Sequence, residues 1–113
     1  MMHLPVQLRE DAIADLQEIA SFIAKSGGSQ KTALAFISRI KAKCLKIGAI
    51  PNGSPLREDL GPGIRLAVFE RSAVIAYRVF PENVEIINVF YGGRDYEALN
   101  LLPSQKKPPS PIR

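Results

Sequence analysis

The spacing of apolar residues changes once along this chain, and that change constrains the fold more than any other feature. From Asp11 to Gly48 the apolar side chains recur every three or four residues, the period of an amphipathic helix. From Ile64 to Tyr91 they alternate or run continuously, as in β-strands. The sequence therefore predicts an α+β fold in which most helical residues precede most of the sheet.

The helical region divides into two helices at the Gly27-Gly28 pair. The first helix carries acidic residues in its N-terminal half, with Asp15 expected to face outward, and the second begins at Ser29 as N-cap and ends at Gly48. The apolar stripes are Ile13, Leu16, Ile19, Ala20 and Ile23 in the first helix, and Ala33, Phe36, Ile37, Ile40, Cys44 and Ile47 in the second. Two such helices joined by a short turn predict an antiparallel hairpin that packs on one face of a sheet.

Three strand-like runs follow, at Ile64 to Glu70, Ala73 to Phe80 and Val84 to Tyr91. Their connections have hairpin length, so we expect an antiparallel meander. The last run is apolar on both faces, which predicts a central position. A short alternating run at Leu4 to Leu8 adds a strand before the helices. The predicted order is β-α-α-β-β-β, a mainly antiparallel sheet with helices on one face and nothing over the other.

Two segments fall outside these elements. Pro and Gly residues bracket a loop of about fifteen residues between the second helix and the sheet, long enough to suggest a binding role. After Gly93, residues Arg94 to Leu102 are expected to form a short helix. The proline-rich end, residues 103–113, is expected to be a disordered tail, which leaves residues 1–102 as one domain.

Charge and composition narrow the function classes. The net charge of +4 and the pI near 9.5 favour an acidic partner such as nucleic acid, a ribosomal surface or an acidic protein. A single cysteine, Cys44, fits a reducing compartment, and no signal or membrane-spanning stretch is present, so we expect a cytoplasmic protein. Cys44 lies on the apolar stripe and is expected to be inert. No His/Cys cluster has metal-ligand spacing, so neither a metal nor a cofactor is predicted.

Several segments, taken together and in order, resemble the RelE/ParE toxin superfamily, and its ParE-like branch most. They span about Leu4 to Leu99 and include Asp15-Leu16 with Ile19 in the first helix, the Pro51 turn, and "REDLGPGIR" from Arg57. The most specific are "VIAYRV" from Val74 and "VEIINVFYGGRDYEAL" from Val84. The resemblance implies a toxin of a type II toxin–antitoxin system.

This resemblance also implies partners. The toxin would be silenced by a cognate ParD-like, ribbon-helix-helix antitoxin and would reach operator DNA only through it. ParE-like members are similar in inhibiting DNA gyrase by trapping its cleaved complex with DNA. RelE-like members instead cut messenger RNA on the ribosome, and this remains the alternative. Because one fold serves both activities, the site must decide between them.

The candidate site combines arginines with aromatic residues. If Ile64, Leu66 and Val68 are buried under the helices, alternation places Arg65 on the uncovered face of the sheet. The same alternation on the next strand places Arg78 on that face. Phe69, Phe80 and Phe90 share that expected face, so we expect an antitoxin segment to cover it and the free toxin to be poorly soluble. An alternative is that the arginines pair with Glu70, Glu82 or Glu85.

Tyr91, Arg94 and Tyr96 lie where such toxins usually place their acid and phosphate contacts. RNA cleavage also requires a base, and no His, Lys or Glu is placed for that role. We therefore expect no catalytic residue and favour gyrase inhibition over RNA cleavage. The second helix has a basic surface that suits an acidic antitoxin or ribosomal RNA, although solvent exposure alone also explains it. Its basic residues are Lys31, Arg39, Lys41, Lys43 and Lys46.

Overall fold

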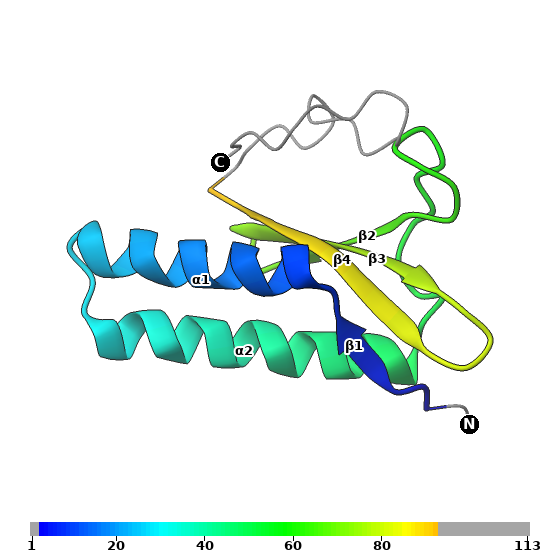
Figure 1. The fold of residues 1–113 in the computed structure, drawn as a ribbon, viewed down its shortest axis with the longest axis horizontal. Helices are drawn as coiled ribbons and strands as arrows, with labels where there is room; N and C mark the ends of the chain where they lie inside the picture. Colours follow the sequence, from blue (N-terminus) through cyan, green and yellow to red (C-terminus); the bar gives the residue numbers. More distant parts are fainter. Residues whose placement is uncertain (1–2, 93–113) are drawn as a thin grey trace.

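The computed structural model describes residues 3–92, which form two helices and four strands (Figure 1). The elements are β1 (Val6–Leu8), α1 (Glu10–Lys25), α2 (Gln30–Ala49), β2 (Arg65–Phe69), β3 (Ala73–Val79) and β4 (Val84–Tyr91). The predicted order β-α-α-β-β-β and the α+β class are confirmed. The expected helix at Arg94 to Leu102 and the expected tail lie outside the described residues.

The four strands form one sheet in the order β1-β4-β3-β2. The last three strands pair as the predicted antiparallel meander, and β1 joins β4 in parallel, so the sheet is mixed. β4 lies between β1 and β3, the central position that its apolar residues on both faces predicted. A register shift between Ala76 and Tyr77 lets β4 carry one extra residue against β3.

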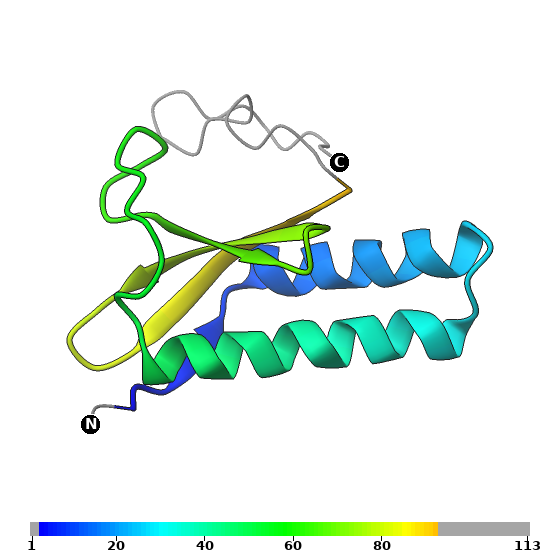
Figure 2. The same ribbon diagram turned by 180° about the vertical axis from the view of Figure 1, so that it is seen from behind.

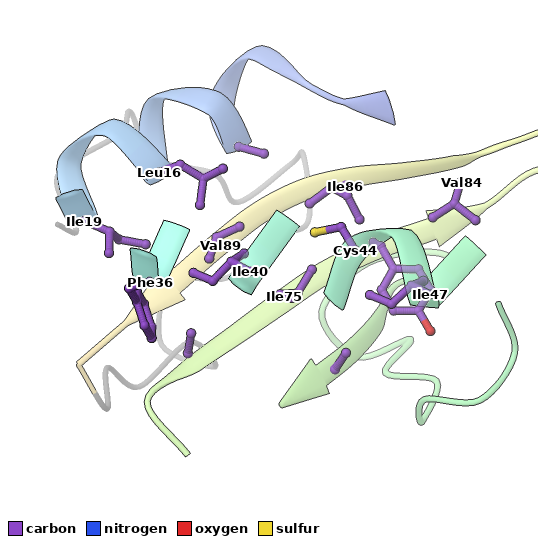
Figure 3. Packing of buried hydrophobic residues seen from close by; sticks show 14 residues of the cluster. Leu16, Ile19, Phe36, Ile40, Cys44, Ile47, Ile75, Val84, Ile86 and Val89 are labelled. Carbon is purple, nitrogen blue, oxygen red and sulfur yellow. The ribbon is translucent and has the colours of Figure 1, made fainter. Parts of the chain in front are cut away.

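Both helices pack on the same face of the sheet and run antiparallel to each other (Figures 1 and 2). Ser29 caps α2 as predicted, since its Oγ accepts a hydrogen bond of 3.0 Å from the Thr32 N–H. Figure 3 shows α2 side chains facing the sheet; the labelled core residues are Leu16, Ile19, Phe36, Ile40, Cys44, Ile47, Ile75, Val84, Ile86 and Val89. Neither described helix combines the length and apolar character needed to span a bilayer.

Cys44 is buried among these core residues, and burial raises the pKa of its thiol to about 11. The thiolate is the reactive form, so the native protein holds almost none of it at neutral pH. We expect iodoacetamide to alkylate Cys44 in the folded protein at a rate limited by unfolding, and rapidly in denaturant. Mass spectrometry over time measures both rates. Equal rates with and without denaturant would contradict this burial.

The sequence analysis predicted that α2 ends at Gly48. This prediction is wrong, because the helix continues to Ala49. Gly48 lies instead where α2 crosses the N-terminal strand, and its carbonyl accepts a hydrogen bond of 2.9 Å from the Leu4 N–H. A Cβ at this position would overlap the Leu4 carbonyl oxygen and come within 2.8 Å of Val6 Cγ2. Glycine is therefore required here for close packing between backbones.

The sheet face away from the helices is not bare, which corrects another expectation. The segment of residues 50–64, between α2 and β2, lies at one end of the sheet (Figure 2), bridges to β2 through Leu56 and Arg65, and packs on this face through Leu60 and Ile64. A second apolar cluster forms beneath it; its members are Leu60, Ile64, Leu66, Ala76 and Phe90, with Val74 and Ile87 packed alongside. We call residues 50–64 the covering segment.

Candidate functional site

Arg65 lies on the helix side of the sheet, so its predicted orientation is wrong. In the β2–β3 register it stands opposite Tyr77, which is fully buried in the core beneath the helices. Its Nη1 donates a hydrogen bond of 2.7 Å to the Ser54 carbonyl in the covering segment. The alternation along β2 was correct, but Ile64 and Leu66 are buried in the second cluster rather than under the helices.

Arg78 does lie on the predicted face, yet its guanidinium is directed to the protein's own backbone. Its Nε donates a hydrogen bond of 2.7 Å to the Pro62 carbonyl. Tyr77 Oη likewise donates to the Pro51 carbonyl at 2.9 Å. Together with Arg65, these side chains attach three points of the covering segment to the sheet. Two of the three carboxylates considered as arginine partners pair elsewhere, Glu70 with Arg39 and Glu85 with Arg9.

These contacts predict a local effect of mutation. Arg78→Ala leaves the Pro62 carbonyl without that donor, so we expect a loss of about 1 kcal/mol in stability, the usual worth of one hydrogen bond. Faster amide hydrogen exchange should be concentrated in the covering segment, where mass spectrometry resolves it. Arg71→Ala, an exposed arginine on the β2–β3 turn, is the matched control. Unchanged exchange in the Arg78 variant would show that the contact does not hold the segment.

The three phenylalanines expected on the bare face are placed differently from one another. Phe69 is on the helix side, with its ring centroid 5.8 Å from that of Phe36. Phe90 is on the expected face but only 7% exposed, within the second cluster. Phe80, just after β3, is 39% exposed. The expected continuous aromatic surface on the sheet is therefore not formed by these residues.

An aromatic cluster does form at the end of β4, on the helix side. Tyr91 contacts Phe22 of α1 and Phe36 of α2, with ring centroids 5.8 Å and 5.4 Å apart. Phe36 in turn contacts Phe69 of β2. Phe22 is 56% exposed and Tyr91 is partly exposed. We call Phe22, Phe36, Phe69 and Tyr91 the aromatic end. Arg94 and Tyr96, the other residues predicted here, lie outside the described residues.

Phe22 was missed by the sequence analysis, although a signal for it was present. It is a large aromatic residue of α1 that lies outside the apolar stripe of that helix. An aromatic residue off the stripe indicates a second contact surface. Only the fold shows that this surface meets the end of β4.

The β2–β3 turn is fixed beside the aromatic end. Arg39 donates two hydrogen bonds to the Glu70 carboxylate, at 2.8 and 3.0 Å, and its guanidinium lies 5.3 Å from the Phe36 ring centroid. The hydrogen bond from Arg39 lowers the pKa of the Glu70 carboxyl. Glu70 and Arg71 have left-handed backbones, with φ of 52° and 60°. The Ser72 carbonyl accepts from the Gly92 N–H at 3.0 Å, which ties the turn to β4.

Asp15 of α1 is buried, although it was expected to face outward. Its Oδ2 accepts hydrogen bonds from the Val89 N–H at 2.9 Å and from Asn88 Nδ2 at 3.0 Å. β1 pairs only with Val84 to Ile86, so β4 continues past the end of its neighbour. Beyond the end of β1, the Asp15 carboxylate accepts the hydrogen bond from the Val89 N–H. It thereby fixes α1 against β4, the strand that carries Tyr91.

The described part of the site combines aromatic rings with arginines that are held by hydrogen bonds. Aromatic rings surround Tyr91, and Arg65 and Arg78 each donate to a backbone carbonyl. Within residues 3–92, no group of three His, Cys, Asp or Glu side chains is arranged to hold a metal ion. Exposed aromatic rings next to a fixed guanidinium are typical of contacts that anchor protein partners.

Comparisons with known proteins agree with this fold. The chain matches the family described as the ParE toxin of the type II toxin–antitoxin system parDE, over residues 6–96. A comparison with curated proteins finds no match. A solved structure from the chromosomal ParDE system of P. aeruginosa is similar, with a TM-score of 0.68 and 20% identity, over 79% of this chain and 96% of that chain. Since the family match spans most of the sequence, this chain belongs to the ParE toxin family.

Proposed function

We propose that this chain is a toxin that inhibits DNA gyrase by binding it, and that a cognate antitoxin neutralises it. Membership of the ParE toxin family supports this proposal, and so does the likeness to a structure from a ParDE toxin–antitoxin system. The choice of binding over cleavage rests on the hydrogen bonds that Arg65 and Arg78 make. Both are directed to carbonyls of the covering segment rather than to an open sheet face.

RNA cleavage sets a stricter requirement. A base for the 2′-hydroxyl and an acid for the leaving oxygen must lie within hydrogen-bond reach of one phosphate. On the described sheet, the face away from the helices carries an apolar cluster beneath the covering segment. Tyr91 lies on the other face, against Phe22 and Phe36. A target held through protein contacts fits this arrangement better than a scissile phosphate held over the sheet.

We assign target contact to the aromatic end. Phe22 and Tyr91 offer exposed ring surface there, while Asp15 and Arg39 hold α1 and the β2–β3 turn in place around them. Rigid aromatic groups lose little entropy on binding, which suits a contact that must capture a large enzyme. Arg94 and Tyr96 follow Gly92 closely in sequence, and we propose them as further contacts of the same site. Arg65, Arg78 and Phe90 then act by holding the sheet and the covering segment together.

We further propose that the neutralising partner is a ParD-like antitoxin with a ribbon-helix-helix domain, through which the toxin reaches operator DNA. Several large apolar residues are exposed on the described part of the chain; they are Ile13, Phe22, Leu34, Leu45, Ile50, Leu56, Val68 and Phe80. Exposed apolar surface of this extent favours association with another protein.

Induction of the gene in cells tests the proposed function through two readouts. Gyrase inhibition predicts DNA double-strand breaks and an SOS response, with transcripts left intact. The Phe22→Ala, Tyr91→Ala double variant should lose most of this toxicity, whereas Val68→Ala, an exposed residue on β2, should keep it. Transcripts cut on the ribosome without DNA breaks would support the RelE-like alternative and overturn the proposal.

A further inference from the structure

The sheet face away from the helices carries a row of apolar residues that is exposed at its outer end. Val68 of β2 pairs with Val74 of β3, and Val74 pairs with Phe90 of β4, so the three side chains cross the sheet in line. Phe90 belongs to the second cluster and Val74 packs alongside it, and alternation from Leu66 places Val68 on the same face. Phe90 is 7% exposed, whereas Val68 is 63% exposed. We call Val68, Val74 and Phe90 the apolar row.

The described part of the chain ends beside this row (Figure 1). The Gly92 N–H donates a hydrogen bond of 3.0 Å to the Ser72 carbonyl in the β2–β3 turn, close in sequence to Val74. Gly92 has a φ of 84°, in the left-handed region, so the backbone turns there instead of continuing the strand. Residues 93–113 therefore begin at a point next to the apolar row.

The sequence after Gly92 contains one further apolar run. Its members are Ala98, Leu99, Leu101 and Leu102. At about 100° per residue, a helix would gather these four side chains within an arc of about 160° and place Glu97 and Asn100 outside it. Pro103 follows directly and would end the helix. Because so short a helix is unstable alone in water, it requires an apolar surface to pack against.

We infer that residues 94–102 form an amphipathic helix that packs on the apolar row, so that the chain covers this part of its own sheet. Nine helical residues are about 13 Å long. The three strands of the row span about 10 Å, so the helix is long enough to cross from β4 to β2. Its leucines would cover the exposed side chain of Val68.

This packing is compatible with the proposed target site. The aromatic end lies on the helix side of the sheet, whereas the apolar row lies on the other side. Arg94 and Tyr96 belong to the start of the inferred helix, next to the end of β4. The inference therefore does not depend on which target the toxin inhibits. It assigns to the chain itself a surface that the sequence analysis assigned to an antitoxin segment.

Tryptophan fluorescence of the full chain tests the inference, because the sequence contains no tryptophan. Leu102→Trp places one reporter on the apolar side of the inferred helix, and Ile112→Trp places one in the proline-rich end as the matched control. Acrylamide should quench Leu102→Trp several-fold less than Ile112→Trp, because a packed indole is shielded from solvent. Adding Val68→Asp should remove this protection, since packing would then bury a carboxylate without a partner. Adding Ile13→Asp, at an exposed apolar residue of α1, should leave it unchanged.

Several results would overturn the inference. Equal quenching of the two reporters would mean that the segment is not packed, and protection that survives Val68→Asp would mean that it packs elsewhere. Protection lost on dilution would assign the row to a second copy of the chain. Protection seen only on co-expression with the cognate antitoxin would assign it to that partner. Circular dichroism checks the fold of each variant, and Leu99→Trp carries the same prediction should an indole not fit at Leu102.

Discussion

A Gly48→Val variant is expected to lose about 3 kcal/mol of stability, the upper range for forcing extra atoms into a packed site. A Cβ at this position overlaps the Leu4 carbonyl oxygen, which is backbone and cannot rotate away. Relief of the overlap requires α2 to move off the N-terminal strand, which also breaks the hydrogen bond from the Leu4 N–H to the Gly48 carbonyl. Urea denaturation followed by circular dichroism measures the change.

Ala42→Val is the matched control for this prediction. Ala42 is an exposed residue of the same helix, so the change adds a β-branched side chain without a packing conflict. It should cost well under 1 kcal/mol, the difference in helix propensity. Equal losses in the two variants would mean that the crossing of α2 and β1 is not as tight as described.

Asp15→Ala is expected to lose about 2 to 4 kcal/mol, because it removes the acceptor for the Val89 N–H and for the Asn88 side chain. Asp15→Asn keeps one side-chain oxygen and should lose less. Glu18→Ala, an exposed acidic residue of the same helix, is the control and should change stability by no more than about 0.5 kcal/mol. Thermal unfolding compares the three. A loss in Asp15→Ala no larger than in Glu18→Ala would contradict the role of this carboxylate.

Much of the fold could be predicted from the sequence because burial imposes a period on it. The limits of α1 and α2 follow from Ser29, from Gly27 and from the apolar repeat, and β4 begins and ends where its apolar run does. Those signals are local, so they are present in the sequence before any tertiary contact is known. The central position of β4 followed from its apolar residues on both faces.

The orientation of β2 could not be predicted for a physical reason. Alternation shows which residues share a face, but not which layer covers that face. Ile64 and Leu66 were assigned to the helix side, whereas they are buried under the covering segment. That segment is rich in Pro and Gly, and Leu60 is its one buried large apolar residue before Ile64. Its sequence therefore does not show that it covers a sheet. The mistaken placement of Arg65 follows directly.

Asp15 and Gly48 escaped prediction for a related reason. Each is explained by a segment distant in sequence, Asp15 by β4 and Gly48 by the strand at the N-terminus. An acidic residue in the N-terminal half of a helix already has a local explanation in the helix dipole, and a glycine near a helix end has one as a terminator. Because each residue has a sufficient local explanation, its tertiary role could not be inferred from the sequence. In the candidate site, Tyr91 was predicted from the sequence. Its contact with Phe22 could be recognised only once the fold was known.

The most direct test of the central claim is a DNA supercoiling assay with purified gyrase and the full-length chain. We predict that the chain inhibits supercoiling of relaxed plasmid and that linear DNA accumulates after denaturation of the enzyme. The Phe22→Ala, Tyr91→Ala variant should inhibit far less, and the cognate antitoxin should restore supercoiling. Unchanged supercoiling with the wild-type chain in molar excess over gyrase would contradict the account.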